Sequence, residues 1–199
     1  FRWWPNTELV SWVGDRRFGS VLEAGCGNGG NLWFLAEHAC DVAGFDNDPT
    51  AVQAARNYMR ERDVALLVRV HHGDVRHLDS VVDARFDLVV DSMTSQHLPF
   101  AEHEALYAEY RRVLKIGGWL WLYHLDCKTV SVRGEWKGAC DWAGLALFPD
   151  VGFFCLPIAT ALVDVVEASG FRTPCVSGLS REYQGSQCAH YTIIEAQRE

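Results

Sequence analysis

The sequence lacks the features that mark membrane proteins and nucleic-acid-binding proteins. None of its apolar runs approaches the length of a membrane span, and no signal peptide is visible, so we expect no membrane contact. Its 26 acidic residues outnumber its 18 lysines and arginines, which gives a formal charge of -8. Because a dedicated nucleic-acid binder needs a basic face, we do not expect nucleic acid as a partner.

Spacings that suit a metal site are also missing. The seven cysteines are scattered without a C-x-x-C pair and the eight histidines lack ligand spacing, so we expect no metal. A metal bridged by Asp91, Asp126 and Asp141 is the alternative that stays open. The cysteine pattern shows no disulfide framework either. It therefore indicates reduced thiols and a cytoplasmic protein.

What the sequence does contain is typical of an ordinary globular domain, with 199 residues, 49% hydrophobic and 22% charged. We expect a single domain over residues 1–199, with an N-terminal helix or lid in 1–19 and a substrate-pocket insertion in 128–156. The first residue is Phe1 rather than methionine, which leaves open a trimmed leader or a larger parent chain.

Short apolar runs alternate with segments of helical periodicity from residue 20 almost to the end. Strands are expected at 20–23, 41–45, 66–71, 86–90 and 119–125, and helices at 31–39, 51–62 and 99–114. Asp48-Pro49 is typical of a helix start, and Gly117-Gly118 is typical of a helix end. The alternation predicts an α/β fold, a doubly wound and mostly parallel sheet with helices on both faces.

The last part of the chain departs from this alternation. Residues 128–156 are rich in glycine and aromatics and have no clean periodicity, whereas 158–169 is expected to be a helix. Two strand-like runs, 173–183 and 188–196, follow with only 184–186 between them. Because so short a loop joins them, these two strands must pair antiparallel.

The stretch VLEAGCGNGG at 21–30 predicts a ligand-binding loop between a strand and a helix. Gly25, Gly27 and Gly30 match G-x-G-x-x-G, the fingerprint of a dinucleotide site. Glu23 with Gly25, Gly27 and Gly29 equally matches E-x-G-x-G-x-G, which looks like a loop for S-adenosylmethionine. These ten residues alone leave both cofactors open.

Further markers occur in register with this loop: an acid after the second strand, Gly73-Asp74 after the third, Asp91 after the fourth, Gly117-Gly118 before the fifth, and a closing hairpin. Together they resemble a class I S-adenosylmethionine-dependent methyltransferase. The resemblance implies a seven-stranded sheet whose last strand lies antiparallel beside the fifth. A nicotinamide domain would not need the hairpin and would usually carry a separate substrate domain, for which this chain has no room.

The resemblance also implies which residues bind S-adenosyl-L-methionine. Glu23 is expected to take the methionine ammonium, although it would alternatively bond the loop backbone. Asp46 is expected to accept hydrogen bonds from the ribose hydroxyls; alternatively, it would only place a negative charge near the start of the next helix. Asp74 is expected to accept from the adenine amino group; alternatively, it would only stabilise a turn. The complete expected set is Glu23, Gly25, Cys26, Gly27, Gly29, Asp46, Asn47, Asp74, Val75 and Asp91.

Two histidines follow strands at the edge where the acceptor must lie. His97 comes after the fourth strand and His124 ends the fifth, so both are candidate general bases. A lone histidine is also commonly a hydrogen-bonded structural residue, and this alternative stays open for each.

The acceptor pocket is expected to form from 128–156 and from the N-terminal residues 1–5. The candidate substrate-binding residues are Trp3, Trp4, Met93, Trp136, Trp142 and Phe153, although the aromatic ones would alternatively pack a subdomain. Residues 1–5 precede a helix that should start near Asn6, and we expect them to form a lid.

We therefore expect methyl transfer to a small molecule, with release of S-adenosylhomocysteine. The residues after the fourth strand do not resemble the Asn-Pro-Pro-Tyr motif of amino-directed DNA methyltransferases. A protein, peptide or RNA acceptor and a non-catalytic partner subunit that binds S-adenosylmethionine are the alternatives. The sequence leaves the methylated atom and the oligomeric state open.

Overall fold

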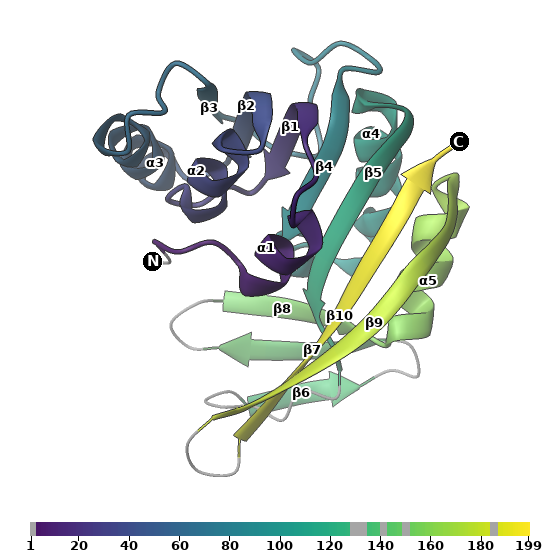
Figure 1. Cartoon of the computed structure of the whole chain (residues 1–199). Coiled ribbons are helices and arrows are strands. Elements are labelled where there is room, and N and C mark those ends of the chain that lie inside the picture. The colour runs from purple at the N-terminus through teal and green to yellow at the C-terminus, as the bar shows by residue number, and fades with distance from the viewer. Residues whose placement is uncertain (1–2, 128–134, 140–142, 149–151, 184–186) are drawn as a thin grey trace.

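A seven-stranded sheet forms the centre of the molecule (Figure 1). The computed structural model describes residues 3–127, 135–139, 143–148, 152–183 and 187–199. The strand order is β3-β2-β1-β4-β5-β10-β9. The strands are β1 (Phe18–Ala24), β2 (Ala39–Asp46), β3 (Val68–His72), β4 (Phe86–Ser92), β5 (Leu114–Leu125), β9 (Phe171–Tyr183) and β10 (Gln187–Arg198).

The pairing directions confirm the expected topology. Strand β1 pairs parallel with both β2 and β4, β2 with β3, and β4 with β5. Strand β10 lies antiparallel between β5 and β9. The last strand is thus inserted beside the fifth, and the carboxyl ends of β1, β2 and β4 meet at one edge of the sheet.

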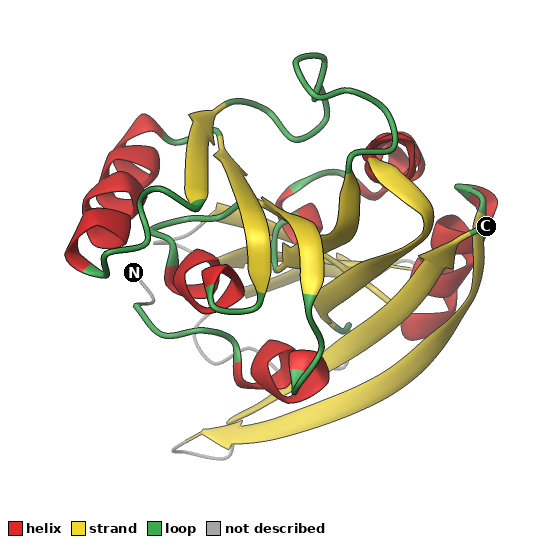
Figure 2. Cartoon of the chain, turned by 45° about the horizontal axis from the view of Figure 1, so that its top comes forward, coloured by secondary structure: helices red, strands yellow, loops and turns green. Residues whose placement is uncertain are grey.

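Helices cover both faces of this sheet, as the alternation predicts (Figure 2). One core contains the buried side chains of α1 (Thr7–Val13), α2 (Gly30–Ala36) and α3 (Pro49–Glu61). The other core contains those of α4 (His103–Val113) and α5 (Ala159–Ala168). Two short 3₁₀ turns, η1 (Ser95–His97) and η2 (Phe100–Glu102), connect β4 to α4.

Two predicted helix starts are confirmed by their caps. The Oδ1 atom of Asn6 accepts hydrogen bonds from the amides of Glu8 (2.9 Å) and Leu9 (3.4 Å). The Oδ1 atom of Asp48 accepts from the amide of Thr50 (2.8 Å). Each cap satisfies backbone donors that the first helical turn leaves without a partner.

One predicted helix end and one predicted glycine cap are wrong. Helix α2 ends at Ala36 instead of residue 39, because Ala39 already pairs with Phe18 in the sheet. Helix α4 ends at Val113, and Gly117-Gly118 lies inside β5 rather than capping the helix. The glycines form a bulge there: Gly117 has a φ of +78°, and the pairing with β4 shifts register around it.

The insertion after β5 contains strands that the sequence does not predict. Strands β6 (Glu135–Ala139), β7 (Ala143–Phe148) and β8 (Gly152–Pro157) form a small antiparallel sheet in the order β6-β7-β8. Glycines interrupt the alternation of side chains there, so the pattern lacks the signal of a strand. Because β8 packs against η1 and β5, this sheet lies near the end of β5.

Within the described residues, no helix has the length and apolar character needed to cross a membrane. The same part of the chain contains no cluster of three or more His, Cys, Asp or Glu side chains suited to a metal ion.

Candidate active site

The glycine loop makes a tight turn between β1 and α2 that requires glycine. Gly25, Gly27 and Gly29 have positive φ angles of +67°, +52° and +90°. A Cβ atom on Gly25 would lie 2.1 Å from Oγ1 of Thr94, so no side chain fits there. A Cβ atom on Gly27 would meet nothing within 4 Å. The backbone of Gly27 is therefore open to a ligand.

A cavity of ≈ 280 Å³ lies beside this loop. It is lined by the N-terminal segment, the end of β1, the loop with the start of α2, and the end of β4. The lining residues are Trp4, Glu23, Gly25, Cys26, Gly27, Asn28, Gly30, Asn31, Ser92 and Met93. The structure thus brings together several predicted cofactor residues and two predicted substrate residues, Trp4 and Met93.

Glu23 is the charged side chain of this cavity, and it is almost fully buried. Its Oε1 atom accepts a hydrogen bond of 2.6 Å from Nδ2 of Asn31, whereas its Oε2 atom has no partner in the part of the chain that the structure describes. Burial raises the pKa of Glu23 to about 8, and the negative charge of Asp46 acts in the same direction. A cation beside Oε2 would relieve this cost, which fits the ammonium that the sequence analysis assigns to Glu23.

Asp46 links the glycine loop to the end of β2. Its Oδ2 atom accepts from the amide of Gly27 (2.7 Å) and its Oδ1 atom accepts from the amide of Asp48 (2.9 Å). Each oxygen retains a lone pair, so the carboxylate can still accept from two hydroxyls. Asn47 follows directly, and its carbonyl contacts Nε2 of His72 at 3.1 Å.

Asp74 has an ionic partner that the sequence analysis missed. The guanidinium of Arg76 binds both its oxygens, with Nη2–Oδ2 at 2.6 Å, and also pairs with Glu102 at 2.7 Å. These hydrogen bonds from Arg76 lower the pKa of Asp74. Val75 beside it is buried. Asp74 also accepts from the amide of Arg76 (2.9 Å), so it has the contact of a turn former; binding of an adenine amino group stays a prediction.

Asp91 is fully buried and is bound to the turn that follows β4. It accepts from the amides of Thr94 (2.9 Å) and Ser95 (3.2 Å) and from the hydroxyl of Tyr110 (3.3 Å). Burial raises the pKa of Asp91 to about 6. The turn holds Met93 at a φ of +71°, which a non-glycine residue rarely adopts, at the wall of the cavity.

The two candidate bases have different surroundings. His124 is 1% exposed, its Nδ1 donates to the carbonyl of Leu125 (2.8 Å), and burial lowers its pKa to about 3. It is therefore neutral at physiological pH. His97 lies exposed at the end of η1, where desolvation lowers its pKa and the charge of Asp46 acts in the opposite direction.

The structure describes the side chains of only some of the remaining candidates for the acceptor pocket. Trp3 is 45% exposed, its ring packs 5.0 Å from that of Tyr58, and Trp4 is 67% exposed at the cavity wall. Trp136 belongs to β6 and Phe153 to β8, but their side chains lie outside the described part, as does all of Trp142.

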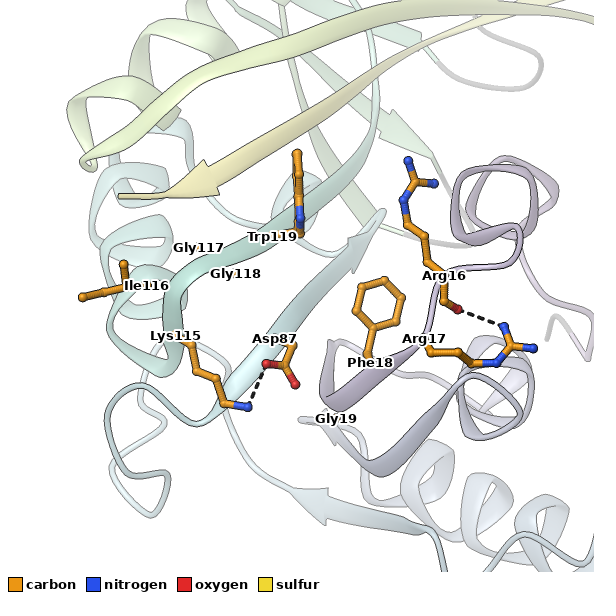
Figure 3. Close-up of a pocket in the computed structure, with 10 residues that line it drawn as sticks. All are labelled: Arg16, Arg17, Phe18, Gly19, Asp87, Lys115, Ile116, Gly117, Gly118 and Trp119. Carbon is orange, nitrogen blue, oxygen red and sulfur yellow. Dashed lines mark hydrogen bonds and ion pairs between the residues drawn. The ribbon is translucent and has the colours of Figure 1, made fainter.

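A second cavity, of ≈ 640 Å³, opens near the amino-terminal ends of β1 and β5, away from the glycine loop (Figure 3). Lys115 and Asp87 form an ion pair of 2.7 Å in its wall, beside Phe18 and Trp119. Ligands of open α/β sheets bind at the carboxyl ends of the strands, so we place the active site at the glycine loop.

Comparison with known proteins agrees with this placement. Residues 21–118, which include the loop, match the family described as a methyltransferase domain. Over 96 residues the chain is 35% identical to 2-heptyl-1-hydroxyquinolin-4(1H)-one methyltransferase from Mycobacteroides abscessus, covering 48% of this chain and 41% of that protein. The chain thus spans less than half the length of this relative.

Two solved structures share the fold across nearly the whole chain. A methyltransferase from Methanosarcina mazei has a TM-score of 0.76 at 18% identity, covering 98% of both chains. The 1,6-didemethyltoxoflavin-N1-methyltransferase of Burkholderia thailandensis, solved with 1,6-didemethyltoxoflavin and S-adenosylhomocysteine, has a TM-score of 0.69 at 20% identity, covering 96% of this chain and 75% of that chain.

The fold and the glycine-loop cavity define an α/β protein with a candidate ligand site at the carboxyl ends of its strands. Residues 21–118 match a methyltransferase domain, and the fold is shared with solved structures across nearly the whole chain. These matches agree with the resemblance to S-adenosylmethionine-dependent methyltransferases, and they confirm the fold that it implies.

Proposed function

We propose that this chain transfers the methyl group of S-adenosylmethionine to a small-molecule acceptor by in-line displacement and releases S-adenosylhomocysteine. The observation that carries the proposal is the cavity at the glycine loop, where Oε2 of Glu23 has no partner and no lysine, arginine or histidine lines the wall within the described part of the chain. Glu23 would hold the methionine ammonium, Asp46 the ribose hydroxyls and Asp74 the adenine amino group, with the backbone of Gly27 against the ligand.

The bound cofactor supplies a methyl group on a sulfonium, a very good leaving group. The task of the protein is therefore mainly to orient the two reactants, which contributes up to about 7–11 kcal/mol in well-oriented systems. Met93 at the end of β4 and Trp4 on the N-terminal segment form walls of the same cavity. We propose that they help to hold the acceptor in line with the methyl group.

We propose that His97 accepts the proton where the acceptor carries one. His97 is exposed at the edge of the site, whereas His124 is buried with a pKa of about 3 and is a very weak base. His124 would then act as a neutral hydrogen-bonding group near the acceptor. Such base catalysis contributes about 10²- to 10⁴-fold in rate.

The small-molecule acceptor is supported by the similar proteins, whose names specify a hydroxyquinolinone and a didemethyltoxoflavin as substrates. Release of S-adenosylhomocysteine with a panel of small aromatic and heterocyclic acceptors would support the proposal. Turnover with peptides or RNA instead would favour those alternatives, and binding of the cofactor without turnover on any of them would favour a partner subunit.

We also propose that residues 1–5 close over the cofactor as a lid. Trp4 lines the cavity, and the hydroxyl of Tyr58 donates to the carbonyl of Trp3 at 2.8 Å, which holds the segment against α3. A cytoplasmic location is a further proposal, supported by the thiols of Cys26, Cys40 and Cys175, which form no disulfide within the described residues.

A further inference from the structure

The glycine-loop cavity contains a second buried polar atom that finds no partner among the described residues. Asn28 is 5% exposed and lines the cavity, and no described residue accepts a hydrogen bond from its Nδ2. Leaving a buried amide donor unpaired costs free energy, so such a group usually marks the place of a ligand or an ordered water.

Asn31, the other asparagine of the cavity, already has a partner at both polar atoms of its side chain. Its Nδ2 donates to Oε1 of Glu23 (2.6 Å) and its Oδ1 accepts from the amide of Asn6 (2.7 Å). Asn31 therefore positions Glu23 and connects it to the start of α1. Asn28 differs from Asn31 in that its buried amide nitrogen has no acceptor among the described residues.

The two unpartnered atoms have opposite character. Oε2 of Glu23 is an acceptor that favours a cation, whereas Nδ2 of Asn28 is a donor that favours an anion or a carbonyl. No lysine, arginine or histidine is among the described residues that line the cavity. A carboxylate bound there would depend on amide donors rather than on an ion pair.

From this geometry we infer that Asn28 binds the α-carboxylate of the cofactor's methionine end while Glu23 binds its ammonium. Asn28 is thus a specificity-determining residue that distinguishes an amino-acid-bearing nucleoside from one without the carboxylate. The inference rests on the proposed function, because it takes S-adenosylmethionine and S-adenosylhomocysteine as the ligands.

Calorimetric titration of Asn28→Ala with three ligands tests the inference. S-adenosylhomocysteine carries both charged groups, decarboxylated S-adenosylmethionine lacks the carboxylate, and 5′-methylthioadenosine lacks both. We expect Asn28→Ala to bind S-adenosylhomocysteine about 10- to 100-fold more weakly, the range for a lost hydrogen bond to a charged group. Its affinity for the other two ligands should stay within about twofold, as expected when the lost partner is absent from the ligand.

Matched variants separate this role from damage to the loop. Asn28→Asp replaces the donor by a negative charge, so it should weaken S-adenosylhomocysteine binding more than Asn28→Ala does. Glu23→Gln should weaken binding of decarboxylated S-adenosylmethionine, which Asn28→Ala should leave unchanged. Asn57→Ala, at an exposed position of α3, is the control and should leave the affinity for every ligand unchanged.

An equal loss of affinity for S-adenosylhomocysteine and 5′-methylthioadenosine in Asn28→Ala would overturn the inference, because it would show only a structural role in the loop. Unchanged affinity for S-adenosylhomocysteine would overturn it too and would assign the donor to water. If the unsubstituted protein binds 5′-methylthioadenosine and S-adenosylhomocysteine equally or not at all, the proposed function fails with it.

Discussion

The substitution Glu23→Gln keeps the size of the side chain and its hydrogen bond to Asn31 but removes the negative charge. With a pKa of about 8, Glu23 is mostly protonated at neutral pH in the empty site, whereas an ammonium ligand favours the carboxylate. Binding of S-adenosylhomocysteine must therefore displace a proton. Below the pKa of Glu23, affinity should rise about tenfold per pH unit, since each unit corresponds to about 1.4 kcal/mol.

Calorimetry at pH 6, 7 and 8, in buffers with different ionisation enthalpies, measures both the affinity and the proton release. We expect the unsubstituted protein to release about one proton at pH 7, and Glu23→Gln to release none and to show a flat pH profile. Glu61→Gln, at an exposed position of α3, should behave like the unsubstituted protein. An affinity of the unsubstituted protein that does not change between pH 6 and 8 would refute this argument.

Glu23 should also make the stability of the ligand-free protein depend on pH. The pKa of Glu23 is raised from 4.5 to about 8, so the folded state binds the proton more tightly than the unfolded state. The stabilisation is fully present below pH 4.5 and is lost as pH rises toward about 8, at about 1.4 kcal/mol per pH unit. Denaturant titrations should show a weaker decline in stability over this window for Glu23→Gln; parallel profiles would contradict the prediction.

Three further predictions concern the rest of the site. Asp46→Ala should weaken S-adenosylmethionine binding by about 2–4 kcal/mol, on the scale of lost hydrogen bonds to a charged group; unchanged affinity in calorimetry would remove this acid from the site. Deleting residues 1–5 should leave the fold intact and lower turnover much more than cofactor affinity, and equal turnover at saturating substrates would show that Trp3 and Trp4 only pack. With an acceptor that loses a proton, His97→Gln should lower turnover about 10²- to 10⁴-fold and should abolish the acidic limb of the pH–rate profile. If His124→Gln loses turnover and His97→Gln does not, the roles of the two histidines are reversed.

Most of the fold could be predicted because its signals are local. The alternation of apolar runs and helical segments predicts the parallel strands, and the short connection at 184–186 requires the antiparallel pairing of β9 and β10. The strands β6–β8 could not be predicted, because glycines obscure the alternation of their side chains. The glycine pair at 117–118 was misassigned, since a bulge and a helix end favour the same residue.

The sequence predicts the position of the ligand-binding loop, but it does not predict which hydrogen bonds the side chains of the site make. Glu23, Gly25 and Gly27 follow from the motif and do line the cavity. The partner of Asp91 at Tyr110 is 19 residues away, so no motif could show that this carboxylate is bound to a turn. Asn28 lies inside the motif, yet only the three-dimensional structure shows that its amide donor is buried without a partner.

The measurement that tests the account most directly is a crystal structure with S-adenosylhomocysteine bound. We expect the ligand in the ≈ 280 Å³ cavity beside the glycine loop, with its ammonium within hydrogen-bonding distance of Oε2 of Glu23 and its ribose hydroxyls on Asp46. A ligand in the cavity at Lys115 and Trp119 instead, or one at the loop with its amino-acid end away from Glu23, would contradict it.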